Sequence, residues 1–200
     1  MAFSGINFRA SSGYVTDGAN DTYCLVTGTV DAYPTTRGGK TFGANATYEW
    51  DVRDWTTGND PRLAGVMLST GSGQIFKFDL PSGAGTYDFR IALGSYNTGA
   101  TWTALIKDGG TTLLTVTGTT SANEFLDATS TVRTAAAWPG SNATTALTFS
   151  GTQLSVVSTA GACYIAHIAV QASGGGSSGL PRLAGKQMTG GFSDLSGGTA

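Results

Sequence analysis

The side chains best suited to chemistry lie in one short stretch, E-W-D-V-R-D. The alternation of a β-strand would put Glu49 and Asp51 on one face and turn Trp50 and Val52 to the other. Two carboxyl groups about 5–5.5 Å apart can act as nucleophile and general acid in retaining glycoside hydrolysis. The alternative is a solvated strand face, in which Arg53 forms a salt bridge with a neighbouring acid.

This stretch resembles E-x-D-x-x-E, the catalytic strand of a jelly-roll family of retaining β-glucanases. The third acid here is Asp54, which is one methylene shorter than the Glu of that pattern. Turn residues follow it, where the family has a long catalytic sheet. The chain has only two glutamates, Glu49 and Glu124. We therefore favour the solvated strand face over catalysis.

No other catalytic set accompanies these acids in the sequence. His167 is the sole histidine, so neither a histidine metal cluster nor a Ser-His-Asp triad has a second candidate base. Its apolar neighbours favour a hydrogen-bonded histidine in the core or at a sheet edge. P-loop and C-x-x-C motifs are missing from the sequence. We predict a protein that is not an enzyme and that uses no catalytic residue, metal or cofactor.

Aromatic residues in expected loops are the better binding candidates. Trp55, Tyr96 and Trp138 each stand among Gly, Asn, Thr or Pro. There a flat ring can stack on a sugar face beside amide donors, so these three are our candidate glycan-binding residues. The alternative is that the rings cover the ends of the fold. Trp102 shares its strand face with aliphatic residues and is predicted to be core.

Two further pairs of residues leave alternatives open. Arg90 beside Asp88 could form a polar site on an exposed sheet or a simple cross-strand ion pair. Cys24 and Cys163 stand in apolar strand contexts, which favours two buried free thiols. A disulfide is the alternative, and the lack of a signal-peptide pattern at the start of the sequence disfavours it.

The rest of the chain is organised around residues 74–94. Phe76, Phe78 and Leu80 alternate with polar residues, and the same alternation resumes at Tyr87. Between the two runs, P-S-G-A-G supplies a Pro and glycines suited to a turn. The pattern predicts a β-hairpin.

These residues, F-x-F-D-L-P-x-G-x-G-T-Y-x-F-R-x-A-L-G, resemble the central hairpin of galactose-binding-like β-sandwich modules. Such jelly rolls accompany polysaccharide esterases and lyases, and similar domains occur in virion proteins of tailed phages. Residues 132–138 resemble the connecting segment of these modules, and residues 162–170 their closing strand. The resemblance covers residues 5–171 in outline. It implies a fold more than a function.

The remaining stretches add strands to the same domain. Residues 101–107 and 111–117 predict a hairpin, and residues 144–150 and 153–157 predict another across Gly151. Residues 31–46 are expected to be an irregular surface loop, because Pro and Gly interrupt any period. Residues 125–134 are ambiguous and compatible with a short helical turn. We predict an all-β protein, a two-sheet antiparallel β-sandwich (jelly roll) spanning residues 1–171.

Composition agrees with this fold and excludes two kinds of partner. Hydrophobic residues make up 40% of the 200 residues and charged residues 12%, against about 25% charged in a typical domain. The net charge is −2, and no run of Lys or Arg marks a surface for nucleic acid or for a membrane. No apolar run approaches the roughly 18 residues of a membrane span.

The composition changes after the domain. Residues 172–179 form a Gly/Ser linker, and residues 180–200 have scattered apolar residues without a period, so an extended C-terminal arm is expected. Pro61-Arg-Leu-Ala-Gly65 recurs in this arm as residues 181–185. Chance explains such a repeat in a chain rich in Ala and Gly. The alternative is that both copies dock on similar surfaces, one within the domain and one on a neighbour. The residues expected to dock on a partner are Leu180, Pro181, Arg182, Leu183, Met188, Phe192 and Leu195.

Together these features favour a structural virion protein of a tailed phage. It would be a capsid decoration or attachment protein that docks through its arm, with other virion proteins and copies of itself as partners. It would be assembled in the host cytoplasm. The alternative is a lectin-like module that binds surface glycans through its loop aromatics.

Overall fold

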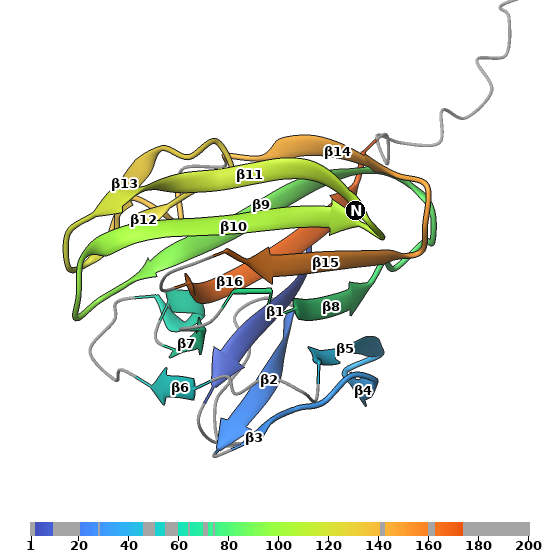
Figure 1. The fold of residues 1–200 in the computed structure, drawn as a ribbon, viewed down its shortest axis with the longest axis horizontal. Helices are drawn as coiled ribbons and strands as arrows, with labels where there is room; N and C mark the ends of the chain where they lie inside the picture. The colour runs from blue at the N-terminus through green and yellow to red at the C-terminus, as the bar shows by residue number, and fades with distance from the viewer. Residues whose placement is uncertain are drawn as a thin grey trace, which may run out of the picture.

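The computed structural model describes residues 3–9, 21–27, 29–45, 51–54, 60–63, 65–69, 72–73, 75–140, 143–159 and 163–173. In this part of the chain the strands form two sheets that pack against each other (Figure 1). The pairs are antiparallel except for β1 with β2. The predicted all-β, two-sheet sandwich is confirmed. The linker beyond Ser173 and the C-terminal segment lie outside the described residues.

The larger sheet has the order β13-β12-β9-β16-β1-β2-β3, with β14 beside β9 and the pair β6–β7 beside β16. The long strand β16 lies at its centre, as its apolar residues on both faces predict. The strands of this sheet are β1 (Ser4–Arg9), β2 (Asp21–Thr27), β3 (Thr29–Val30), β6 (Asp51–Asp54), β7 (Gly65–Ser69), β9 (Gly85–Ser95), β12 (Glu124–Leu126), β13 (Val132–Thr134), β14 (Thr145–Phe149) and β16 (Cys163–Ala172).

The smaller sheet has the order β11-β10-β15-β8-β5-β4. Its strands are β4 (Thr35–Arg37), β5 (Lys40–Ala44), β8 (Ile75–Asp79), β10 (Ala100–Asp108), β11 (Thr111–Thr120) and β15 (Gln153–Ser158). The predicted hairpin of β10 and β11 is confirmed, with Asp108 opposite Thr111. A 3-10 helix, η1 (Pro61–Leu63), precedes β7.

The predicted hairpin within residues 74–94 is wrong. Strand β8 pairs with β5 and β15 in the smaller sheet, whereas β9 pairs with β12, β14 and β16 in the larger one. The intervening turn therefore crosses from one sheet to the other. Tyr87 holds this turn, because its hydroxyl donates to the Gly83 carbonyl at 2.8 Å and accepts from the Ser82 N–H at 3.1 Å.

The predicted hairpin of residues 144–157 is wrong for the same reason. Strand β14 pairs with β9, whereas β15 pairs with β8 and β10. Asp108 fixes this second crossing turn by accepting from the Ser150 hydroxyl at 2.6 Å, the Ser150 N–H at 2.7 Å and the Gly151 N–H at 3.2 Å. The two crossings are joined, since the Leu80 N–H donates to the Thr152 carbonyl at 2.8 Å.

Two stretches are more regular than expected. Within residues 31–46, β4 and β5 form a hairpin whose two turn residues, Gly38 and Gly39, have φ of 58° and 72°. That backbone conformation suits a tight two-residue turn and explains why both positions are glycine. Residues 125–134 contain β12 and β13 and no helical turn. The loop between these strands is organised by Asp127, which accepts from the Thr129 N–H at 2.8 Å and from Arg133 Nε at 2.8 Å.

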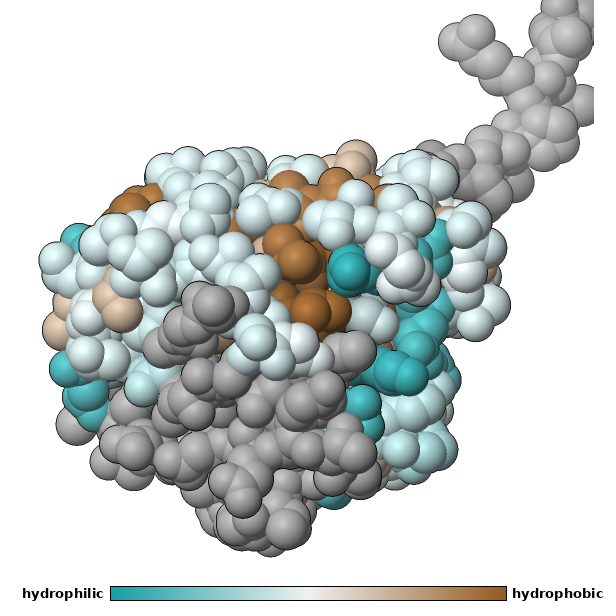
Figure 2. All heavy atoms as spheres, viewed as in Figure 1, coloured by the Kyte–Doolittle hydropathy of each residue, from teal (hydrophilic) through white to brown (hydrophobic). Residues whose placement is uncertain are grey.

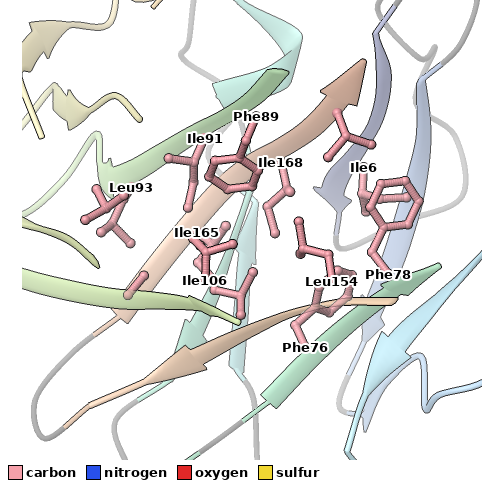
Figure 3. Close-up of a cluster of buried hydrophobic side chains, with 14 of the residues drawn as sticks. Ile6, Phe76, Phe78, Phe89, Ile91, Leu93, Ile106, Leu154, Ile165 and Ile168 are labelled. Carbon is pink, nitrogen blue, oxygen red and sulfur yellow. The ribbon is translucent and has the colours of Figure 1, made fainter. Parts of the chain in front are cut away.

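The main core fills the space between the two sheets. Figure 3 shows side chains from both sheets meeting there, and the rings of Phe8 and Phe76 lie edge to face at 5.1 Å. Trp102 has no exposed surface and donates from Nε1 to the Thr120 hydroxyl at 2.6 Å, so its predicted core position is confirmed. Core residues labelled in Figure 3 are Ile6, Phe76, Phe78, Phe89, Ile91, Leu93, Ile106, Leu154, Ile165 and Ile168.

The two cysteines are buried free thiols, as the sequence favoured. Burial raises the pKa of the Cys163 thiol to about 12. Burial, followed by the nearby Asp31 carboxylate, raises the pKa of Cys24 as well. Both thiols therefore stay protonated and unreactive in the folded protein.

Candidate functional site

The outer face of the larger sheet is covered by η1 and by the loop that contains Trp138. This ring has no exposed surface, and its Nε1 donates to the Ile91 carbonyl at 3.0 Å. Around it lies a second apolar cluster, separate from the core between the sheets. Its buried members are Leu63, Val66, Ala92, Phe125, Ala135, Trp138 and Ala166.

Arg90 of β9 lies under this cover and is only 7% exposed. Its Nη2 donates to the carbonyls of Trp138 at 3.1 Å and Pro139 at 2.8 Å, and its guanidinium lies 4.3 Å from the indole centroid. Burial, and then the neighbouring Arg62, lowers the pKa of Arg90. Both alternatives for Arg90 and Asp88 are wrong. Arg90 is neither on an exposed sheet nor paired with Asp88, whose carboxylate instead accepts from the Ser173 hydroxyl at 2.8 Å.

On the same side of the sheet, Arg62 lies 5.3 Å from the centroid of the Trp138 ring. Asp60 holds it there by accepting from Nη2 at 2.8 Å and from Nε at 3.1 Å. The same carboxylate accepts from the Arg62 N–H at 2.8 Å, while the Asp60 carbonyl accepts from the Leu63 N–H at 3.0 Å. Asp60 therefore fixes both the start of η1 and the direction of the Arg62 side chain.

His167 completes this covered polar cluster. Its Nδ1 lies 2.7 Å from Asn7 Oδ1, and its ring meets Trp138 edge to face at 5.5 Å. Burial, and then Arg62 and Arg90, lowers the pKa of His167 well below its ordinary value, so the ring is neutral. The expectation of a hydrogen-bonded core histidine is confirmed. Among the described residues, the buried Asn7 Nδ2 and Arg90 Nε have no hydrogen-bond partner. These two donors could serve an ordered water.

The outer face of the smaller sheet is different. On β10, Trp102 and Ile106 point into the core, while Leu105 lies on the outer face and is partly exposed. Leu105 is opposite Thr115 of β11 and opposite Val157 of β15, which is also partly exposed. We call the row Thr115–Leu105–Val157 the outer strip. Figure 2 shows apolar residues gathered in the middle of this face.

Polar groups flank the outer strip on both sides. Towards one end of β10, threonine hydroxyls pair across the strands, with Thr101 and Thr119 at 2.8 Å and Thr103 and Thr117 at 2.8 Å. Towards the other end lies a cluster around Asp79. Its Oδ1 accepts from the Tyr33 hydroxyl at 3.0 Å and from Gln153 Nε2 at 3.0 Å. Lys77 Nζ lies 5.2 Å from the centroid of the Tyr33 ring. Burial, and then Asp79, raises the pKa of Tyr33.

The structure separates the three glycan-binding candidates. Trp138 is buried, and Tyr96 is partly buried with its ring edge to face on Phe125 at 5.4 Å. For Trp138 the structure shows the alternative, in which the ring covers part of the fold. The Tyr96 ring keeps some exposed surface, so its role in glycan binding stays a prediction. Trp55 lies outside the described residues. Tyr33 was missed by the sequence analysis, because it precedes Pro34 in a stretch expected to be an irregular loop.

The other predicted residues are not brought into a site. Glu49 and the docking residues of the C-terminal segment lie outside the described residues. Asp51 and Asp54 are in β6, and their side chains are likewise outside the description. Across the described ranges, no group of three or more His, Cys, Asp or Glu side chains could hold a metal ion. In the same ranges no helix is long and apolar enough to cross a membrane.

No known protein family matches this chain, and no curated protein sequence matches it either. The fold therefore defines its class. The chain is a two-sheet, mostly antiparallel β-sandwich. Loops cover the outer face of its larger sheet, and the outer face of its smaller sheet carries exposed threonines.

Proposed function

We propose that this chain is a non-enzymatic structural protein of a tailed-phage virion, a decoration or attachment protein that docks through residues 180–200. The observation that carries this proposal is the fixed point at which the chain leaves the sandwich. Ser173 donates from its N–H to the Thr86 carbonyl at 2.8 Å and from its hydroxyl to Asp88 at 2.8 Å. A segment that follows such an anchor starts from a defined place on the domain, which suits attachment to a neighbouring subunit.

The use of carboxylates in the domain also supports a structural role. Asp60, Asp108 and Asp127 each accept several hydrogen bonds from the turn or loop beside them. Each one thereby stabilises the backbone of a connection between strands. Residues 5–171 resemble galactose-binding-like sandwich modules in outline, and the occurrence of similar domains in virion proteins of tailed phages points the same way.

Particle composition tests this proposal. Virions should be prepared with the full chain and with a variant that ends at Ser173, and the copy number of each should be measured by quantitative mass spectrometry. We expect the full chain to co-purify in many copies and the shortened variant to be lost from the particle while its melting temperature is unchanged. Full occupancy by the shortened variant would contradict docking through the C-terminal segment. A full chain missing from purified virions would contradict the virion assignment itself.

A glycan-binding module is the second candidate, and Tyr33 is the observation that favours it. Its partly exposed ring is held by Asp79 beside Gln153 and Lys77, which together offer a ring, an acceptor and donors to a sugar. A glycan array compares the two candidates. A lectin should lose its signal in Tyr33→Ala and keep it in Thr36→Ala, a control exposed on neighbouring β4. The absence of any signal from the full chain would count against the glycan candidate.

A further inference from the structure

The repeated pentapeptide P-R-L-A-G connects the covered sheet face with the C-terminal segment. The first copy, residues 61–65, includes η1. Its Leu63 has no exposed surface, and its Arg62 is held against an aromatic ring by a carboxylate. Residues 61–63 of this copy thus form a tight turn on the outer face of a β-sheet with the leucine inward.

The second copy, residues 181–185, has the same five residues in a different setting. Leu180 precedes it where Asp60 precedes the first copy. The arginine of the second copy therefore lacks the acidic neighbour that holds Arg62, and the segment gains a second leucine. A surface that matches this segment offers an apolar patch for Leu180 and Leu183 and a carboxylate for Arg182.

The outer face of the smaller sheet offers both features. The outer strip supplies partly exposed apolar side chains, Leu105 and Val157. Asp79 supplies the carboxylate. In the described chain both of its hydrogen bonds end on Oδ1, so Oδ2 remains as an acceptor for a guanidinium. Gln153, opposite Asp79, is four residues from Val157 along β15, about 13 Å at 3.3 Å per residue. Arg182 is one residue from Leu183 and two residues from Leu180, at most about 7 Å along an extended backbone, so its long side chain has to span the remaining distance to Asp79.

We propose that residues 180–185 of one copy of the chain dock on the outer strip of a second copy, with Leu180 and Leu183 on Leu105 and Val157 and with Arg182 on Asp79. This inference rests on the proposed function, since it names the surface that receives the docking segment. The contact joins two different surfaces, so it repeats from copy to copy and builds rings or chains of subunits.

A mixing experiment with full-length chains tests the contact. Leu183→Asp breaks the docking segment and leaves the strip intact, whereas Leu105→Asp breaks the strip and leaves the segment intact. Each variant should sediment as a monomer in analytical ultracentrifugation, while the unaltered chain self-associates. An equimolar mixture of the two variants should form a one-to-one dimer, because each supplies the surface that the other lacks. A mixture that stays monomeric overturns the proposal.

A charge exchange tests the ionic part of the contact separately. Asp79→Lys and Arg182→Asp should each weaken self-association at least tenfold, and the double variant should recover most of it. Thr119→Asn, on the same sheet face but away from the strip, is the matched control and should associate like the unaltered chain. No recovery in the double variant overturns the assignment of Asp79. Circular dichroism and melting curves verify that each variant is folded.

The mixing experiment can fail without contradicting attachment of the chain to the virion. If the mixture fails while the full chain still occupies virions, the strip is not the receptor and the proposed function stands. If Leu105→Asp keeps self-association but loses binding on a glycan array, the strip is a sugar surface and the proposal is overturned.

Discussion

The two outer faces of this sandwich show two ways in which a β-sheet can face away from the core. The larger sheet carries η1 and the Trp138 loop on its outer face, and these bury Arg90 and His167. The smaller sheet carries paired threonines and the outer strip, which stay at least partly exposed. Inward and outward side chains alternate in the same way along the strands of both sheets. The outer faces differ because the connections between strands cover one of them and leave the other open.

The covered face shows what it takes to bury a charge. Arg90 keeps its positive charge because two backbone carbonyls and the face of an indole replace part of its hydration. On the open face, water itself hydrates the charged groups of Lys77 and Lys107. We therefore expect substitutions on the covered face to cost far more stability than those on the open one.

The largest effect is expected from the ring at the centre of the covered face. Trp138→Ala removes a fully buried aromatic side chain and the partner of both Arg62 and Arg90. It should lower the free energy of unfolding by about 3–5 kcal/mol, as measured by urea denaturation. Trp102→Ala, in the core between the sheets, should cost a similar amount. A loss below about 1 kcal/mol for Trp138 would show that the cover is loosely packed.

A smaller loss is expected at Arg90. Arg90→Met keeps most of the apolar stem but leaves the carbonyls of Trp138 and Pro139 without their donor. The cost should be about 1.5–3 kcal/mol, typical of hydrogen bonds to a charged group. Asp88→Asn, two residues earlier on the same strand face, is the control and should stay within about 0.5 kcal/mol. Equal losses of unfolding free energy in Arg90→Met and Asp88→Asn would show that the buried hydrogen bonds of Arg90 contribute no more stability than the contacts of Asp88.

Asp108 should make stability depend on pH at the crossing turn of residues 150–152. Hydrogen bonds from the Ser150 hydroxyl and then the Ser150 N–H hold the pKa of Asp108 below its ordinary value of 3.8. A carboxyl whose pKa is lowered by folding stabilises the protein above its unfolded pKa, and this contribution is lost as the pH falls through the folded pKa. Unfolding curves of the unaltered chain and of Asp108→Asn should therefore differ at pH 7 and converge below pH 3.8. A constant difference across this range would contradict the assignment.

The smallest effect is expected on the open face. Thr101→Ala removes one member of an exposed threonine pair. The free energy of unfolding should change by no more than about 0.5 kcal/mol, since the remaining hydroxyl can bond to water. A loss comparable to that of Arg90→Met would show that the open face is as tightly organised as the covered one.

Much of the fold follows from the sequence alone, because alternation reports which side chains face a core. The runs around Phe76, Tyr87, Trp102 and Leu154 all became strands with those side chains buried. The buried free cysteines and the hydrogen-bonded His167 were likewise predictable from their apolar neighbours. The Asp108-Gly-Gly turn also predicted its hairpin correctly, because a short turn with a positive-φ glycine favours pairing of the strands it joins.

The pairing of the other strands was decided by tertiary structure. Alternation is the same in a hairpin and in a turn that crosses between two sheets, so residues 74–94 could not reveal that β8 and β9 belong to different sheets. The long-range bonds from Leu80 to Thr152 and from Ser150 to Asp108 hold those crossings, and no local pattern encodes them.

The same limit applies to the candidate sites. Trp138 and Tyr96 stood in predicted loops, yet packing against Arg90 buries the Trp138 ring completely, and packing against Phe125 leaves the Tyr96 ring only partly exposed. Tyr33 and the outer strip come from segments far apart in the sequence, which only the sheet order brings together. The sequence by itself determined which side chains are apolar, which strands form and that one pentapeptide occurs twice. Only the folded sheets decided which face is covered and which is left open, because a face is covered by segments that contact it at long range.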